Sequence, residues 1–362
     1  MNRSASECMA MNDTSCACQL TAAPVVTSLS VALLLTVPTL GQETGAERVE
    51  PGRAGGVEFR CATLEQAKEV LQQNDPFIQN LSSFDRQARM RTRTDPGTTA
   101  FVEFVANEAI EWNASERKAI VQAIELLGER LGSLHMENLP LPLDDPILLV
   151  HTTGREESGA AYTRGSSIIL PRGKTGTRKQ PPLRLIAHEL FHVLSRSNPE
   201  LRDKLYAIIG FQPTGVIHLP ASLSPRRITN PDAPQVAHAM EVQLSEGRTS
   251  FVAPVLLTRS EFAPEQPSLF SYLDFKLMEV ERAENGDWIP HAVRGEVVLH
   301  DPSLPDFHRQ IGRNTGYIIH PDEVLADNFV ILVSGESVKD QWIVDRMREL
   351  LSSVEKEPNP GR

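Results

Sequence analysis

The sequence has few cysteines, no long apolar run and no block of basic residues. Only four of its 362 residues are cysteine, and three of them, Cys8, Cys16 and Cys18, lie near the start of the chain. The formal net charge is −11, and lysine and arginine are scattered. We therefore expect no nucleic-acid partner and no binding to anionic membrane surfaces.

The one strongly apolar stretch lies near the N-terminus. Residues 20–40 carry no charge, and their apolar centre, Val25 to Val37, suits a signal-peptide core better than a membrane-spanning helix. We predict a signal peptide at residues 1–41, with export to the periplasm or the exterior and no membrane attachment after cleavage. Because Arg3 is the only basic residue before this stretch, an uncleaved anchor is the alternative. Cleavage leaves Cys61 as the single cysteine and excludes an intramolecular disulfide framework.

The remaining chain divides by composition and periodicity. We predict a linker and helical N-terminal extension at 42–100, a catalytic domain at 101–352 and a flexible tail at 353–362. Apolar periods of 3.6 predict helices, and alternating or continuous apolar runs predict strands. The predicted helices are 115–132 (capped by Ser115), 182–196, 201–211, 322–334 and 337–352; the predicted strands are 147–152, 160–170, 251–257, 275–282 and 293–299. Asn285-Gly286 predicts a hairpin turn within a β-rich insertion at 213–316.

The strongest chemical signal is the pentapeptide HELFH at 188–192. Residues four apart on a helix share a face, so His188 and His192 can bind one metal ion. Glu189 lies one position further round, where it can act as general base toward a zinc-bound water. The alternative is a pair of histidines on an ordinary core helix.

A catalytic zinc needs a third protein ligand and an open position. In metzincins the third ligand is a histidine six residues after the second one, with a glycine between them. These positions hold Asn198 and Ser195 here, which excludes that class. In thermolysin-like gluzincins the third ligand is a glutamate followed four residues later by an aspartate, but Gln212 stands at its usual spacing. The pattern recurs far downstream as Glu323 and Asp327, on one face of a strongly apolar helix.

Glu323 can therefore serve as the third ligand while Asp327 fixes the orientation of a ligating histidine. The alternative for this pair is an exposed acidic first turn that complements the helix dipole. The competing third ligands are His238, Glu241 and Glu246.

The HELFH helix and the helix that carries Glu323 and Asp327 together resemble the gluzincin metallopeptidases over about 145–335. The resemblance implies an α+β, zincin-like catalytic domain, with a small mixed sheet, an active-site helix and a glutamate helix. It implies that strand 160–170 is an edge strand that pairs with an extended substrate. It also implies a donor to the oxyanion, for which Tyr317 and His320 are the local candidates. The long insertion departs from the family pattern and leaves the substrate class open.

Two features near the predicted site have simpler alternatives. His320 can instead cap the following helix, and Tyr317 can pack in the core. The turn Thr229-Asn230-Pro231-Asp232 can line a cleft, although a structural Asx-turn is the default for such a sequence.

These features predict a zinc metallopeptidase with one Zn²⁺ per chain, held by His188, His192 and Glu323, that acts on a peptide or protein. Two other functions fit the same residues. One is a zincin-fold binding or scaffold protein that has lost turnover, and the other is a zinc hydrolase of non-peptide amides. The sequence leaves the oligomeric state open.

Overall fold

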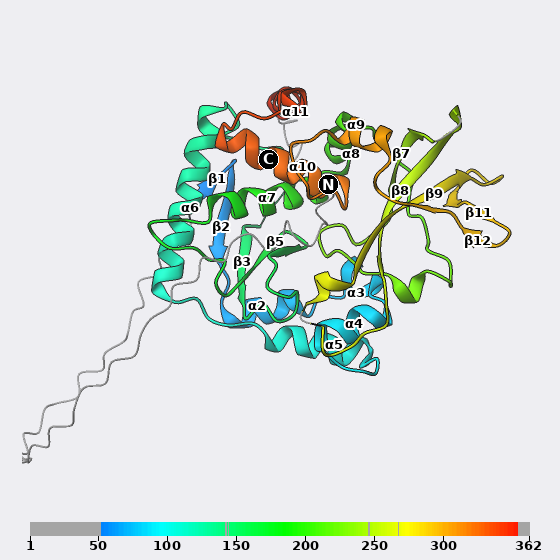
Figure 1. The fold of residues 1–362 in the computed structure, drawn as a ribbon. Helices are drawn as coiled ribbons and strands as arrows, with labels where there is room; N and C mark the ends of the chain where they lie inside the picture. Colours follow the sequence, from blue (N-terminus) through cyan, green and yellow to red (C-terminus); the bar gives the residue numbers. More distant parts are fainter. Residues whose placement is uncertain (1–51, 142, 144, 245–246, 267, 354–362) are drawn as a thin grey trace, which may run out of the picture.

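The computed structural model describes residues 52–141, 143, 145–244, 247–266 and 268–353, in a mixed α+β arrangement (Figure 1). The predicted signal peptide and the tail beyond Ser353 lie outside these residues. Within the described part, no helix is both long and apolar enough to span a bilayer.

The first sheet has five strands in the order β1-β2-β3-β5-β4. Its strands are β1 (Arg53–Ala54), β2 (Val57–Cys61), β3 (Ile147–Thr152), β4 (Tyr162–Arg164) and β5 (Ser167–Pro171). Strands β2, β3 and β5 are parallel, and β4 pairs with β5 in the antiparallel sense. Strand β3 has the predicted bounds. Residues 53–61, which the sequence places in the linker and extension, instead contribute two strands to this sheet.

The predicted single strand 160–170 is wrong, because the chain turns back on itself within it. Gly165 has a φ of +57°, a conformation that glycine adopts at little cost, and it separates β4 from β5. Strand β4 is therefore the edge strand, and β5 lies between it and β3.

Two layers of helices cover the sheet on opposite faces (Figure 1). Leu149 and Ile168 pack with α6, α7 and α10, whereas their neighbours Val150 and Ile169 pack with α2, α3 and α5. This alternation follows from the two-residue period of a strand. The first layer comprises α6 (Ala114–Ser133), α7 (Leu183–Ser197), α8 (Pro199–Ile208), α10 (Pro321–Ser334) and α11 (Gln341–Ser353). The second comprises α2 (Leu64–Leu71), α3 (Pro76–Asn80), α4 (Ser83–Met90) and α5 (Gly97–Asn107).

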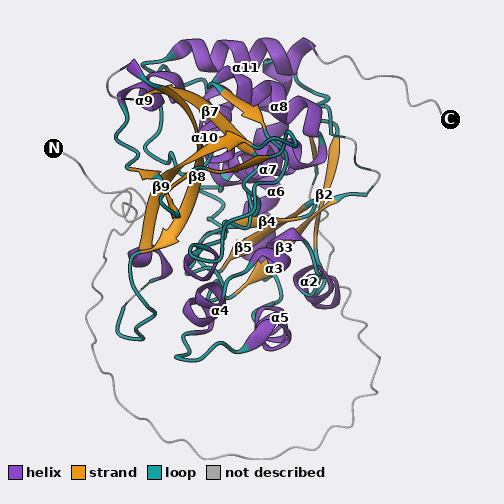
Figure 2. Ribbon diagram, turned by 90° about the vertical axis from the view of Figure 1, so that its right-hand side faces the viewer, coloured by secondary structure: helices purple, strands orange, loops and turns teal. Residues whose placement is uncertain are grey.

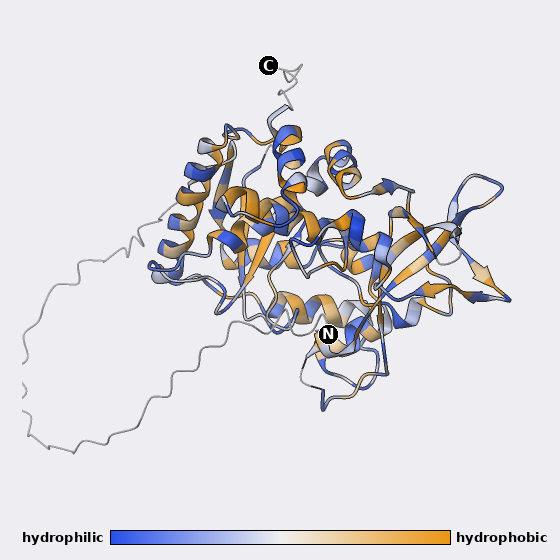
Figure 3. Ribbon diagram, turned by 45° about the horizontal axis from the view of Figure 1, so that its top comes forward, coloured by the Kyte–Doolittle hydropathy of each residue, from blue (hydrophilic) through white to orange (hydrophobic). Residues whose placement is uncertain are grey.

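The helix termini agree with the sequence to within a few residues. At α6 the cap differs, because Asn113 rather than Ser115 accepts hydrogen bonds from the first turn and forms a capping box with Glu116. Hydrophobic residues gather along the elements in the middle of the molecule (Figure 3), where α7 and α10 pack together.

The insertion forms a second, antiparallel sheet in the order β10-β9-β8-β7-β6, with β13 also paired to β9. Figure 2 shows three of its strands, β7, β8 and β9. Its elements are β6 (Phe211–Pro213), η1 (Ser224–Arg226), β7 (His238–Gln243), β8 (Thr249–Thr258), η3 (Leu269–Tyr272), β9 (Leu273–Arg282), β10 (Trp288–Pro290), β11 (Ala292–Val293), β12 (Glu296–Val297), β13 (Leu299–His300) and α9 (Pro305–Ile311). The predicted hairpin at Asn285-Gly286 is confirmed, since Trp288 pairs with Arg282.

The predicted strand 293–299 is broken into three short pieces. Arg294 and Gly295 both have positive φ, of 56° and 86°, so the chain makes a tight turn between β11 and β12. The apolar residues on either side of this turn produced the appearance of one continuous strand.

Candidate metal centre

The two histidines of HELFH lie one turn apart on α7 and face α10. Their ring centroids are 4.7 Å apart with the rings nearly perpendicular. His192 is fully buried, and His188 keeps a small exposed edge. Helix geometry therefore brings two imidazoles to one point, as the spacing predicts.

Glu323, in the first turn of α10, completes the group. Its Oε2 lies 3.2 Å from Nε2 of His188 and 3.5 Å from Nε2 of His192. Ligand atoms of all three residues lie within 4.8 Å of one another, so these residues could hold a metal ion. The three side chains that the sequence names as ligands are thus brought together across a separation of more than 130 residues.

A carboxylate lies behind each imidazole. Nδ1 of His188 is 3.1 Å from Oδ1 of Asp327, and Thr315 donates a hydrogen bond to the other oxygen of Asp327. Nδ1 of His192 is 2.7 Å from Oδ2 of Asp322, whose Oδ1 accepts a hydrogen bond of 2.7 Å from Tyr206. Such contacts favour the tautomer that turns Nε2 toward a metal.

Asp322 is a site residue that the sequence analysis missed. It directly precedes Glu323, and a search for carboxylates four apart does not select it. Asp322 is buried, and a buried aspartate in an apolar helix needs a partner, but this burial is visible only in the fold.

The charges around the histidines favour a cation. Burial disfavours protonation of His188, but its hydrogen bonds to Asp327 and Glu323 outweigh burial and raise its pKa to about 10. Burial likewise opposes protonation of His192, yet the charges of Asp232 and Glu323 raise its pKa well above the usual value. Burial would raise the pKa of Glu323, but His192 and His188 lower it. A bound cation would take the place of the imidazole protons.

Two buried atoms at this point also lack a hydrogen-bond partner among the described residues. Oε2 of Glu189 and Nε2 of His192 make no hydrogen bond, and both side chains are almost fully buried. Burial, with the charge of Asp232, raises the pKa of Glu189 to about 8. Unsatisfied buried polar atoms are rare and mark places where an ion or water belongs. The donor set and these atoms together fit a metal ion.

The turn Thr229-Asn230-Pro231-Asp232 lies against the same group. Asn230 donates a hydrogen bond of 2.6 Å to Oε1 of Glu323. Asp232, Glu189 and His192 form a second group whose ligand atoms lie within 4.8 Å of one another. The cleft-lining interpretation of this turn is therefore the one that the structure supports, although Asp232 also bonds Asn230 as in an Asx-turn.

A buried ionic network anchors the turn. Arg89 of α4 donates to the carbonyl of Thr229 at 2.9 Å and to Glu157 at 2.6 Å, and it pairs with Asp85. The backbone N–H of Thr229 donates to Oδ1 of Asp85 at 3.1 Å. Arg89 and Asp85 are almost fully buried, so this network holds the turn firmly against α4.

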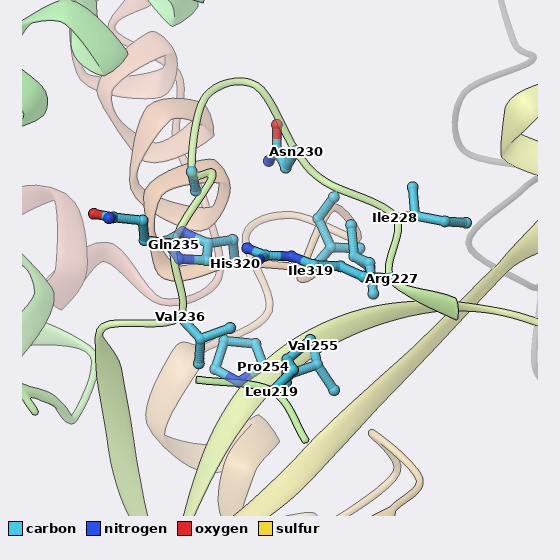
Figure 4. A pocket seen from close by; sticks show the side chains of 12 residues that line it. Leu219, Arg227, Ile228, Asn230, Gln235, Val236, Pro254, Val255, Ile319 and His320 are labelled. Atoms are coloured by element: carbon cyan, nitrogen blue, oxygen red, sulfur yellow. The ribbon is translucent and has the colours of Figure 1, made fainter. Parts of the chain in front are cut away.

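The two predicted oxyanion donors differ in position. Tyr317 is half-buried and borders a cavity with Asn230 and Asp232. Burial and the charges of Glu323 and Asp232 raise its pKa well above the usual value. His320 instead caps α10, because its Nδ1 accepts the N–H of Asp322 at 3.1 Å. It borders a separate small cavity with Asn230 and Ile319 (Figure 4).

The two competing third ligands that lie in the described part of the chain, His238 and Glu241, do not join the group. His238 bonds Asp203 at 2.9 Å and packs on the ring of Tyr206. Glu241 is exposed on β7, and Glu246 lies outside the described residues.

Comparison with known proteins gives one family match. Residues 150–200, which contain the end of β3, the β4–β5 hairpin and all of α7, match the family model of the eCIS core domain. The match includes His188, Glu189 and His192 but not Glu323, and it covers less than half of the chain. No curated protein and no solved structure matches the chain.

Proposed function

We propose that this chain is a zinc-dependent metallopeptidase of the gluzincin type with a zincin-like catalytic domain. The observation that carries the proposal is the meeting of His188, His192 and Glu323 at one buried point, beside the partnerless carboxylate oxygen of Glu189. A purely structural metal site has no use for such an extra base. Export through the signal peptide at 1–41 remains a prediction.

His188, His192 and Glu323 would hold the ion, and Asp327 and Asp322 would orient the two histidines. Zinc held there would supply a Lewis acid that polarises a substrate carbonyl and activates water. Glu189 would accept the proton of the attacking water and pass it to the leaving amine.

Tyr317 is the proposed donor to the oxyanion. It lies beside Asn230 and Asp232, close to the carboxylates that influence its pKa, and its raised pKa keeps the phenol protonated. His320 is less suited to this task, because its Nδ1 is engaged in capping α10.

The second candidate is a metal-containing binding or scaffold protein without turnover. The observation that favours it is the position of Asn230 and Asp232, which crowd the metal group from the insertion side. In the peptidase Glu189 is the general base, whereas in the scaffold protein it has no catalytic role.

The test measures metal content and peptide cleavage in the same samples. The full chain should bind about one zinc, by plasma mass spectrometry, and should cleave members of a quenched-fluorescent peptide library in a chelator-sensitive way. Glu189→Gln should keep the zinc and lose cleavage, whereas Glu129→Gln, an exposed position on α6, should change neither. Cleavage that survives Glu189→Gln would contradict the proposed role of this residue. One bound zinc without peptide cleavage, in both the wild type and Asp232→Ala, would favour the scaffold protein.

A further inference from the structure

We propose that Asp232 blocks the metal centre from within the chain, so that the protein as folded is a latent peptidase. The inference rests on the proposed function and adds its regulation. Asp232 would occupy the ligand position that a catalytic zinc keeps open, and it would also cover the edge strand on which a peptide would lie.

The first observation concerns the metal. Ligand atoms of Asp232, Glu189 and His192 lie within 4.8 Å of one another, and His192 belongs to the His188–His192–Glu323 group as well. Because both groups share His192, whose Nε2 makes no hydrogen bond, we infer that they describe neighbouring sides of a single site. A zinc with three protein ligands is catalytic because its fourth position is open, and a fourth protein ligand closes it. Asp232, whose carboxylate lies beside His192, is the residue that we propose to close it.

The second observation concerns the edge of the first sheet. Strand β4 pairs on one side with β5, and Thr163 is its middle residue. The N–H of Thr163 donates to Oδ1 of Asp232 at 2.7 Å, and its hydroxyl donates to the same oxygen at 2.6 Å. An extended peptide that adds to a sheet edge needs such outward N–H groups. Asp232 therefore holds the main-chain donor that a substrate would use.

The third observation is a clamp that keeps the turn in place. Arg196, near the end of α7, donates to the carbonyls of Pro231 and Asp232 at 3.3 and 3.0 Å and to that of Gly165 at 2.8 Å. Asn230, which belongs to the same turn, donates a hydrogen bond to Glu323 of α10. The turn is thus tied to α7, to α10 and to the β4–β5 hairpin. Access for a substrate requires that these contacts open together.

The experiment uses the full chain loaded with Co²⁺, whose visible spectrum reports inner-sphere ligands, and acetohydroxamate as a small probe for an open position. Asp232→Ala should bind the probe about ten-fold or more tightly than the wild type, because no internal ligand competes. Asp232→Asn removes the charge but keeps an oxygen for Thr163, so it should give an intermediate affinity. Asp301→Asn, at an exposed carboxylate, should match the wild type.

A second readout needs no metal and no turnover. Hydrogen exchange at residues 162–164 should accelerate in Asp232→Ala, because Thr163 loses its acceptor, and should stay unchanged in Asp301→Asn.

Cleavage by Asp232→Ala should exceed that of the wild type about ten-fold or more. If the wild type and Asp232→Ala bind acetohydroxamate with equal affinity, the proposal is overturned, even if both cleave peptides.

Failure of the proposed function would be visible separately. If neither protein cleaves any peptide but Asp232→Ala alone gains tight probe binding, Asp232 blocks a centre that is not a peptidase. If no cobalt binds to either protein, both proposals are overturned.

Discussion

The helix pair α7–α10 and the turn at 229–232 meet at the same buried point, yet the sequence describes them very differently. On the two helices, the candidate site residues follow a local spacing: His188 and His192 are four residues apart, as are Glu323 and Asp327. The residues of the turn are instead defined by hydrogen bonds to α4, β4 and α10, whose partners lie 69 to 144 residues away along the chain. The proposed metal ligands can therefore be recognised from local periodicity, whereas the proposed control of access to the metal depends on tertiary packing.

The largest effect should come from loss of a ligand on the helix pair. His192→Ala removes one of the three proposed ligands, so zinc affinity should fall on the order of 10³-fold. Titration against a chromophoric chelator measures this. His238→Ala, a buried histidine outside the group, should leave the affinity unchanged. Equal losses in both variants would mean that the helix pair does not hold the ion.

The next effect should come from the anchor of the turn. Arg89→Met leaves Asp85 and Glu157 buried without their cation, so the free energy of unfolding should fall by about 3–5 kcal/mol. Urea unfolding of the metal-free protein measures this. Arg93→Met, whose ion pair with Glu265 is exposed, should change the stability by less than about 1 kcal/mol. A small change in Arg89→Met would show that the turn is not held by this network.

The carboxylates behind the histidines should have a smaller effect on metal binding. Asp322→Asn should weaken zinc about 10–100-fold, because it disturbs the orientation of His192 without removing a ligand. Asp327→Asn should lie at the lower end of this range, since Asp327 is one-third exposed. Peptide cleavage per bound zinc should stay within a few-fold of the wild type, which separates positioning from catalysis.

The smallest effect concerns the insertion sheet, away from the metal. Burial opposes ionisation of Glu279, but hydrogen bonds from Arg248, His300 and Ser250 lower its pKa from 4.5 to about 2. A lowered folded-state pKa stabilises the protein above pH 4.5, and this stabilisation is lost as the pH falls toward 2. Glu279→Gln should therefore be about 1–2 kcal/mol less stable than the wild type at pH 7, and this difference should vanish near pH 2. A difference that does not depend on pH would show that packing, not charge, is responsible.

Much of the helix pair could be predicted from the sequence. The bounds of α7 and α10 follow from apolar periodicity and from the prolines that begin them, and the shared faces of the ligands follow from helix geometry. Asp322 was missed because its importance comes from burial against His192 and Tyr206, which only packing reveals.

The sheets show the same limit. Strands β1 and β2 were assigned to a polar extension, because two short segments joined by Gly55-Gly56 carry almost no periodic signal. The turn at Gly165 is hidden between two apolar segments and makes β4, rather than a longer strand, the edge. Asp232 lies in a sequence typical of an ordinary turn, and its neighbours Glu189 and Thr163 belong to other elements. Such neighbours are set by the fold, not by local spacing.

The most direct test of the central claim is the position of the ion in a crystal of the zinc-loaded chain, located by anomalous scattering at the zinc edge. The account predicts one peak, about 2.0–2.2 Å from Nε2 of His188, Nε2 of His192 and a carboxylate oxygen of Glu323. A peak bound by Glu189, His192 and Asp232 without Glu323, or no peak on α7 at all, would contradict it.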